Sequence, residues 1–384
     1  MDEGRSEAPH EEPSAARVSG ELELDARLLE FLLEPAPPAL ELGSIPPPAV
    51  LSRPSAHEPP ADSNVWLRPP AVPRDAPRIE RVVIRDIAPA PQRTPTPPPP
   101  PPTNETRAER LVAQLKGAGP GLEAHLVQPL LRLGPDALPV LARSFPGLLW
   151  FNRRHPHRAV ARGRDVSAIS RALVAFGDAA VPTVQSLLSH RHPDVRFYAT
   201  LVAQEIPSPS MVHDLAEATL DADPGVREVA AAGLVGRGPE AVKHATASLR
   251  AAIEGSLLAP APLGFAIVAL ARLRDPLAPR VLIPVIELGD AELNDLSLRA
   301  LAMLTGQTFG RDTKAWRRWL EKNERLPRVE WLLESLEHGH PSVFEYLCDE
   351  LAYLAGERLG EAAVDAPRER KRLADAYRAF WKRR

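Results

Sequence analysis

From Arg107 onward the chain is a succession of short amphipathic segments. Apolar residues recur there every three or four positions, over stretches of about 10 to 14 residues, which is the spacing of one helix face. Glycine or proline separates one stretch from the next, as at helix ends. This pattern predicts an all-α domain over residues 107–384.

One type of turn between these segments occurs twice. LLRLGPDALPVL, from residue 130, aligns with ALVAFGDAAVPTV, from residue 172. Glycine suits a left-handed helix end, and proline suits the first turn of a helix, where its missing N–H is not needed. We therefore predict that Gly134 and Gly177 end helices and that Pro139 and Pro182 begin the next ones.

A second turn also recurs, as HPDVRFYA (His192–Ala199) and DPGVREVA (Asp223–Ala230). Its prolines, Pro193 and Pro224, are 31 residues apart. A helical period of about 30 to 45 residues is typical of solenoids, in which each unit packs on the next. Both turns therefore favour an α-solenoid of helical hairpins.

These second turns resemble those of HEAT repeats, in particular the short bacterial HEAT-like class also seen in phycobilisome lyase-like proteins. The resemblance rests on PDVR at 193–196 and PGVR at 224–227, followed by Ala199 and Ala230, and it extends over roughly residues 107–384. It implies an extended surface that can serve many unrelated partners. A phycobilin lyase activity is disfavoured, because the only cysteine, Cys348, lies in an apolar helical pattern typical of a core residue.

Residues 1–106 are predicted to be a disordered, proline-rich region. Most of the 44 prolines lie there, and Pro97–Pro102 is unbroken proline, a stiff polyproline spacer. Two islands interrupt this region: Glu21–Glu34, and Arg78–Ile87, which has the composition of a short strand. The first island places four apolar residues on one helical face, as in a linear motif that binds a partner or as residual apolar character of a tail: Leu24, Leu28, Phe31 and Leu32.

Charge and hydropathy exclude some classes of protein. The formal net charge is -3 and the pI about 6.4, so a chain that coats nucleic acid or membranes through a broad positive surface is not expected. No apolar run approaches the roughly 20 residues of a membrane span, and the acidic N-terminus is not a secretory signal. We expect a cytoplasmic protein; the dominance of arginine over lysine points to a GC-rich genome, and the HEAT-like resemblance implies a bacterial one.

A basic insertion at about residues 149–165 is the least repeat-like part of the predicted solenoid. Guanidinium groups beside aromatic rings can bind phosphate, a nucleic-acid backbone or an acidic peptide. The alternative is a solvated loop between hairpins. The candidate partner-binding or anion-binding residues are Trp150, Arg153, Arg154, His155, His157, Arg158, Arg162 and Arg164.

The C-terminal part of the chain contains a repeated glycine and aromatic pattern and a basic end. Gly306 and Gly356 are predicted to reverse the backbone, and the aromatic residues that follow to pack on the last hairpins, with Asp312 as a helix N-cap. The basic residues at about 367–384 are predicted to form a polar capping helix.

The search for catalytic chemistry gives no candidate. HEAT-repeat hydroxylases hold iron with His-Glu pairs inside their repeats, but here such pairs occur only at residues 10–11 and 57–58, in the proline-rich region. We predict no catalytic residue, no metal site and no cofactor. The favoured function is a non-catalytic protein-protein interaction scaffold whose partner is not identified, and the alternative is a nucleic-acid-binding or DNA-base-processing HEAT-like protein that uses the Arg-rich insertion.

Overall fold

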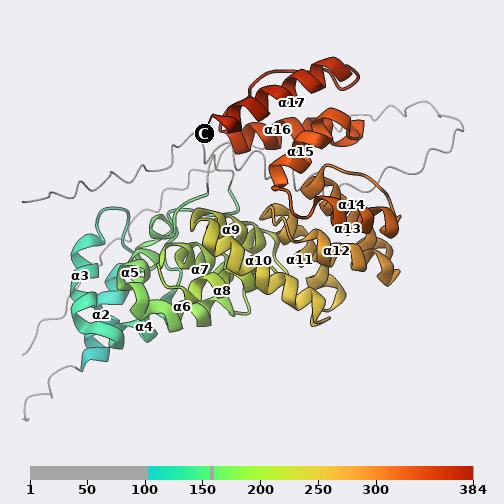
Figure 1. Ribbon diagram of the computed structural model, residues 1–384. Coiled ribbons are helices and arrows are strands. Elements are labelled where there is room, and N and C mark those ends of the chain that lie inside the picture. Colours follow the sequence, from blue (N-terminus) through green and yellow to red (C-terminus); the bar gives the residue numbers. More distant parts are fainter. Residues whose placement is uncertain (1–102, 156–159, 384) are drawn as a thin grey trace, which may run out of the picture. The chain divides into compact units, whose positions relative to one another are not determined.

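The computed structural model describes residues 103–155 and 160–383, all within one compact unit (Figure 1). Regular structure in these residues is helical throughout, and no strand occurs among them, so the predicted all-α class is confirmed. The first helix begins at Asn104, three residues before the predicted start at Arg107. Both islands of the proline-rich region, including the motif at Glu21–Glu34, lie outside the described residues.

The first half of the described chain contains α2 (Asn104–Leu115), α3 (Ala124–Leu133), η1 (Gly134–Ala137), α4 (Leu138–Ser144), η2 (Gly163–Asp165), α5 (Ala168–Phe176), η3 (Gly177–Ala180), α6 (Val181–Leu188), α7 (Pro193–Glu205), α8 (Ser210–Ala218), α9 (Pro224–Gly236) and α10 (Pro239–Glu254). The second half contains α11 (Pro260–Arg272), α12 (Pro279–Val285), η4 (Ile286–Leu288), α13 (Ala291–Thr305), α14 (Thr313–Asn323), α15 (Arg328–His338), η5 (Pro341–Val343), α16 (Phe344–Ala355) and α17 (Pro367–Lys382).

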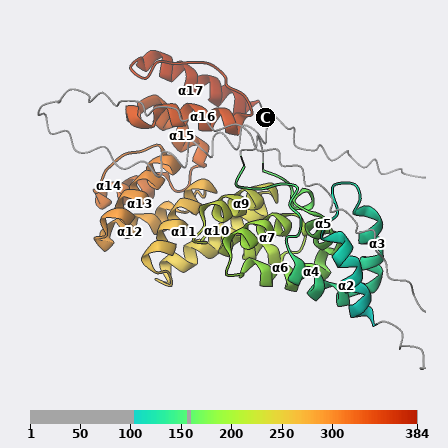
Figure 2. The same cartoon turned by 180° about the vertical axis from the view of Figure 1, so that it is seen from behind.

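The helices contact one another in two series. Each odd-numbered helix from α3 to α15 packs against the next odd-numbered helix, and each even-numbered helix from α2 to α12 packs against the next even-numbered one. Figures 1 and 2, seen from opposite sides, show the labelled helices following one another in chain order. A residue on one helix therefore meets mainly residues from the helices one or two places before and after its own.

Side-chain caps set several helix starts. The Asp223, Asp290 and Asp312 carboxylates each accept a hydrogen bond from a backbone N–H three residues later, which satisfies a donor that the first helical turn leaves unused. The predicted N-cap role of Asp312 is thus confirmed. Gly306 and Gly356, with φ values of 72° and 82°, end α13 and α16 in the left-handed conformation expected for them.

The two glycines of the first recurring turn behave differently from the prediction. Gly134 and Gly177 have positive φ values of 69° and 55°, but their ψ values of -154° and -131° are extended rather than left-handed helical. The chain therefore turns directly into a 3₁₀ segment, η1 or η3, before the next α-helix. Pro139 and Pro182 do lie in the first turn of α4 and α6, as predicted.

Three apolar clusters form the interior. The largest runs from α2 to α14, and a second joins α15, α16 and α17 and contains Cys348. Burial raises the pKa of this thiol to about 11, in agreement with the predicted core role. A third, small cluster lies where the Arg-rich segment meets α7 and α9, around Phe151, Phe197 and Tyr198.

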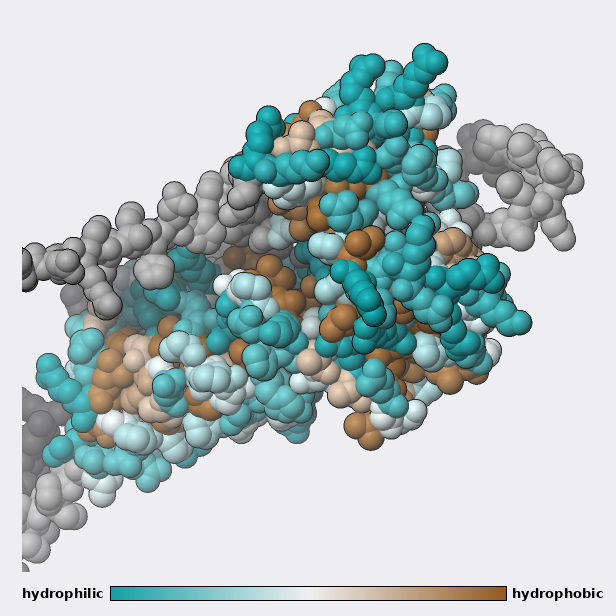
Figure 3. All heavy atoms as spheres, in the orientation of Figure 1, coloured by the Kyte–Doolittle hydropathy of each residue, from teal (hydrophilic) through white to brown (hydrophobic). Residues whose placement is uncertain are grey.

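The surface seen in Figure 3 is mostly polar, with apolar residues exposed between polar ones. Leu257, Leu122 and Leu288 are the most exposed large apolar residues of the described chain, at 76%, 65% and 64%. Isolated exposed leucines of this kind are common on proteins and define no site by themselves. None of the described helices combines the length and the apolar character needed to cross a bilayer.

The basic C-terminal helix α17 is more than a polar cover. Arg370, only 7% exposed, donates hydrogen bonds to the carbonyl oxygens of Leu336 (2.7 Å), Ser335 (3.2 Å) and Gly339 (2.9 Å). These carbonyls lie at the end of α15, where the last turn leaves carbonyl oxygens without an intrahelical donor; that of Ser335 also accepts from the Gly339 backbone N–H at 2.6 Å. The guanidinium thereby fixes α17 on α15.

Candidate binding groove

The Arg-rich segment after α4 lies against the N-terminal ends of α7 and α9. Arg153 reaches two helix starts at once: its Nε lies 3.1 Å from Asp194, and its Nη1 and Nη2 lie 3.2 and 2.6 Å from the two oxygens of Asp223. The same guanidinium lies over the Phe197 ring, 4.7 Å from its centroid. The backbone N–H of Arg153 donates to the Tyr198 hydroxyl at 3.2 Å. These contacts hold the segment on the two helices.

Other predicted site residues of this segment also bind within the chain. Arg154 pairs with Asp194 at 2.7 Å, and Arg164 pairs with Glu205. Trp150 donates from its indole nitrogen to a backbone carbonyl at 3.1 Å and lies under a guanidinium. Three of the predicted anion-binding arginines, Arg153, Arg154 and Arg164, therefore already have carboxylate partners, which reduces the positive charge that the sequence suggested.

The remaining predicted residues of the segment are less constrained. His155 and Arg162 are exposed on the surface. His157 and Arg158 lie outside the described residues. The structure thus does not gather the eight predicted side chains into one pocket.

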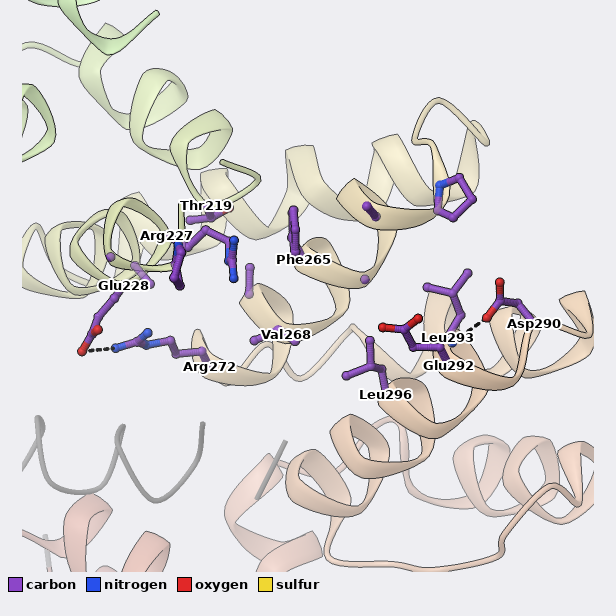
Figure 4. Close-up of a pocket in the computed structure, with 17 residues that line it drawn as sticks. Thr219, Arg227, Glu228, Phe265, Val268, Arg272, Asp290, Glu292, Leu293 and Leu296 are labelled. Carbon is purple, nitrogen blue, oxygen red and sulfur yellow. Dashed lines mark hydrogen bonds and ion pairs between the residues drawn. The ribbon is translucent and has the colours of Figure 1, made fainter. Parts of the chain in front are cut away.

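A pocket of about 640 Å³ lies instead between α11, along its whole length, and the first turns of α9 and α13 (Figure 4). A concave, mostly apolar space of this size with a few polar groups is typical of ligand and peptide sites. It is lined by Thr219, Pro224, Gly225, Arg227, Glu228, Ala231, Pro260, Ala261, Gly264, Phe265, Val268, Ala269, Arg272, Asp290, Glu292, Leu293 and Leu296.

Small residues create this space. Ala231 on α9 and Ala261, Gly264 and Ala269 on α11 line the pocket with little side-chain volume. A Cβ at Gly264 would lie 3.3 Å from Leu296 Cδ1, so the absence of a side chain there lets α11 and α13 approach closely. The large apolar walls are Phe265, Val268, Leu293 and Leu296.

Charged groups lie at both ends of the pocket. Figure 4 shows Glu228 and Arg272 toward one end and Asp290 and Glu292 toward the other. Glu228 and Arg272 form an ion pair at 3.7 Å, and Asp290 accepts a hydrogen bond from the Leu293 backbone N–H at 3.0 Å as the N-cap of α13. Glu292 is exposed in the first turn of α13.

Arg227 supplies the other charge of the pocket. Its guanidinium carbon lies 4.0 Å from the centroid of the Phe265 ring, and Nη1 donates to the carbonyl oxygens of Asp221 (2.7 Å) and Ala222 (3.0 Å). Burial lowers the pKa of this guanidinium, against the opposite influence of the Asp221 and Asp223 carboxylates. An arginine remains a cation even so, and within the described chain its Nε and Nη2 groups meet no acceptor.

A second cavity, of about 700 Å³, borders α8 and the start of α10. It is lined by apolar residues such as Pro207 and Val212 together with polar ones such as His213 and Glu240. Its arginine, Arg237, donates to the carbonyl oxygens of Ala203 and Ile206 at the end of α7. Arg227 lies over the Phe265 ring at the wall of the α9, α11 and α13 pocket, and we take that pocket as the candidate site.

This pocket is not among the sites predicted from the sequence. The one sequence feature that points to the pocket is Arg227, three residues after Pro224 in the recurring turn. Arg196 holds the same position after Pro193, so the motif alone does not distinguish a structural arginine from a binding one. No group of three or more His, Cys, Asp or Glu side chains in the described part of the chain is arranged to hold a metal ion.

Comparison with known proteins identifies no relative. No protein-family model matches the chain, and no curated protein matches it. Two solved structures, both crystal structures of engineered proteins from a structural genomics consortium, align with 17% identity. One covers 72% of this chain and 78% of its own with a TM-score of 0.28, and the other covers 65% and 97% with a TM-score of 0.25. Scores this low carry no conclusion about fold or function.

Proposed function

We propose that this protein is a non-catalytic scaffold of HEAT-like helical repeats and that the groove between α9, α11 and α13 binds a peptide segment of a partner protein. The observation that carries the proposal is the 640 Å³ space with apolar walls and charged ends. Grooves of this kind take up the side chains of a bound segment, while polar groups at the ends fix its orientation.

The packing of the helices supports the scaffold part of the proposal. Odd-numbered and even-numbered helices form two series of successive contacts, as stacked hairpins of a solenoid would. The recurring turns at Pro193 and Pro224 both begin helices, α7 and α9, at matching positions. In such a stack the successive helices of one series, here α9, α11 and α13, form one continuous face, which suits an extended ligand.

The intramolecular pairing of Arg153, Arg154 and Arg164 is the reason to prefer a protein partner to nucleic acid. Phosphate binding depends on cations that are free to replace the counterions of the backbone. Here the carboxylates of Asp194, Asp223 and Glu205 already occupy these positions.

Site-directed photo-crosslinking tests the groove directly. A benzoylphenylalanine is placed at Ala261, which is exposed in the first turn of α11 and lines the pocket. The matched control is Ala247, an exposed alanine of α10 outside the pocket. The full chain is expressed in the organism that carries the gene, and crosslinked proteins are identified by mass spectrometry.

We expect a defined partner to be crosslinked from position 261 and not from position 247. An Ala261→Trp variant, in which the indole fills the pocket, should no longer copurify with that partner. Identical crosslinking patterns at both positions, or a partner whose copurification is unaffected by Ala261→Trp, would contradict the proposal.

A further inference from the structure

We propose that the groove recognises a peptide through a carboxylate side chain bound to the free Nε and Nη2 edge of Arg227, next to a large apolar side chain that enters the pocket. The inference rests on the proposed function and specifies the chemistry of the partner. It follows from a comparison of two arginines within this chain.

Arg196 and Arg227 occupy equivalent positions in successive turns. Nη1 of Arg196 donates to the carbonyl oxygens five and six residues before it, at 3.2 and 2.9 Å. Nη1 of Arg227 donates in the same register, at 3.0 and 2.7 Å. The other edge of Arg196 binds Asp221 in a bidentate manner, with Nε 2.6 Å from Oδ2 and Nη2 2.8 Å from Oδ1. Both edges of the Arg196 guanidinium therefore have hydrogen-bond acceptors within the chain.

Among the described residues, no carboxylate binds the corresponding edge of Arg227. The carboxylates that act on it electrostatically are those of Asp221 and Asp223. Asp221 is bound to Arg196, and Asp223 is bound to Arg153 and to the backbone of α9. A guanidinium fork that is held in place by two backbone carbonyls and lacks a bidentate partner is prepared to accept a carboxylate.

The sequence after α10 explains the difference between the two turns. Asp221 comes from the segment that joins α8 to α9, whereas the segment that joins α10 to α11, Gly255–Ala259, reads GSLLA and contains no acidic residue. The Phe265 ring of α11 lies against Arg227 instead. The carboxylate that binds Arg196 is therefore supplied by the chain itself, whereas the matching position beside Arg227 is open to the pocket.

The other groups of the pocket define the rest of the ligand. α11, with Phe265 and Val268, lies between Arg227 on α9 and Glu292 on α13, so a peptide that crosses the three helices meets a cation, an apolar wall and an anion in turn. Glu228 contributes little negative charge because Arg272 is paired with it. We therefore infer an acidic residue, a large apolar residue and a basic residue, in the order in which the ligand crosses α9, α11 and α13.

Selection from a random peptide library displayed on phage tests this inference with the purified full chain. Bound peptides are sequenced, and the dissociation constants of the strongest are measured by fluorescence anisotropy with synthetic copies. We expect enrichment of peptides with Asp or Glu beside a large apolar residue. Their affinity should fall about tenfold or more with Arg227→Gln, because a bidentate charged hydrogen bond is lost.

Two controls separate binding from folding. Arg318→Gln removes a positive charge from an exposed position of α14 and should leave the affinity unchanged. Changing the peptide's acidic residue to its amide leaves the protein intact, and it should weaken binding as much as Arg227→Gln does. This second measurement remains decisive even when Arg227→Gln lowers the stability of the fold.

Two results would overturn the inference in different ways. Peptides whose binding is abolished by Ala261→Trp but unaffected by removal of their acidic residue would refute the carboxylate site and leave the proposed groove standing. A selection that gives no peptide sensitive to Ala261→Trp would contradict both the carboxylate site and the groove.

Discussion

Arg328 donates a hydrogen bond of 2.6 Å to Glu350, a carboxylate with no exposure to solvent. Arg274, from the turn after α11, donates to both oxygens of the same carboxylate at 2.9 and 3.1 Å. Arg328 also donates to the Leu304 carbonyl oxygen at 3.0 Å, at the end of α13. Three separate parts of the chain therefore meet at one buried anion.

Removal of this anion should strongly destabilise the protein. Glu350→Ala leaves two guanidinium groups without their counter-charge, and breaking a buried ion pair in this way costs about 3 to 5 kcal/mol. Urea denaturation followed by circular dichroism measures the free energy of unfolding. Glu345→Ala, at an exposed position of the same helix, is the control and should change it by no more than about 0.5 kcal/mol. Equal effects of the two substitutions would show that the buried cluster contributes nothing to stability.

The same carboxylate predicts a loss of stability in acid. Burial alone would raise the pKa of Glu350, but the charges and hydrogen bonds of Arg328 and Arg274 outweigh it and hold the pKa below the ordinary value of 4.5. A lowered folded-state pKa contributes stability above the unfolded pKa, and this contribution is lost as the pH falls through the folded-state pKa. The free energy of unfolding should therefore decrease below about pH 4.5, and less steeply in Glu350→Gln. Parallel pH profiles of the two proteins would contradict this assignment.

Gly163 tests the close packing of the Arg-rich segment on α7. A Cβ at this position would lie 2.8 Å from Val202 Cα and closer still to the Leu201 carbonyl oxygen, so the backbone has to shift. We expect Gly163→Ala to cost about 1 to 3 kcal/mol, as overpacking does. Gly236→Ala is the matched control, since nothing lies within 4 Å of its Cβ, and alanine should leave α9 equally stable or more stable by up to about 1 kcal/mol. Thermal unfolding compares the two, and a fully tolerated alanine at 163 would show that the segment does not pack on α7.

The pairing of the arginines also predicts the response to nucleic acid. Because Arg153 and Arg154 are engaged by Asp194 and Asp223, we expect duplex DNA to bind no more tightly than non-specific complexes, with a dissociation constant of about 10⁻⁴ M or weaker at physiological salt. Fluorescence anisotropy at low and physiological ionic strength measures this. Tight binding with steep salt dependence, abolished when Arg153, Arg154 and Arg158 are changed to alanine, would instead favour a nucleic-acid-binding protein.

Local features of this fold could be predicted from the sequence because their causes are local. The spacing of apolar residues predicted the helices, and proline marked the first turn at Pro139 and Pro182. Asp312 was recognisable as an N-cap because the side chain bonds to its own helix. Each of these effects acts over a few residues and can therefore be recognised in the sequence.

The candidate site was not predictable because it depends on contacts between residues that are far apart in the sequence. Asp223, the N-cap of α9 and a partner of Arg153, lies 70 positions further along the chain, and no sequence pattern pairs the two residues. Arg196 and Arg227 occur in nearly the same motif, and only the three-dimensional contacts show that one is bound to a carboxylate and the other is not. The pocket itself depends on small residues of α9 and α11 and on leucines of α13 that lie far apart in the sequence.

The contacts of Arg153 have a consequence for how the protein opens. Helices that touch only their neighbours can come apart one hairpin at a time, each with its own opening free energy. Arg153 binds the first turns of both α7 and α9, through Asp194 and Asp223, from a segment that precedes them. Separation of α7 from α9 therefore breaks one of the two ion pairs of Arg153 in addition to the contacts between the helices. The backbone amides of these two helices should therefore exchange with solvent as a single cooperative unit.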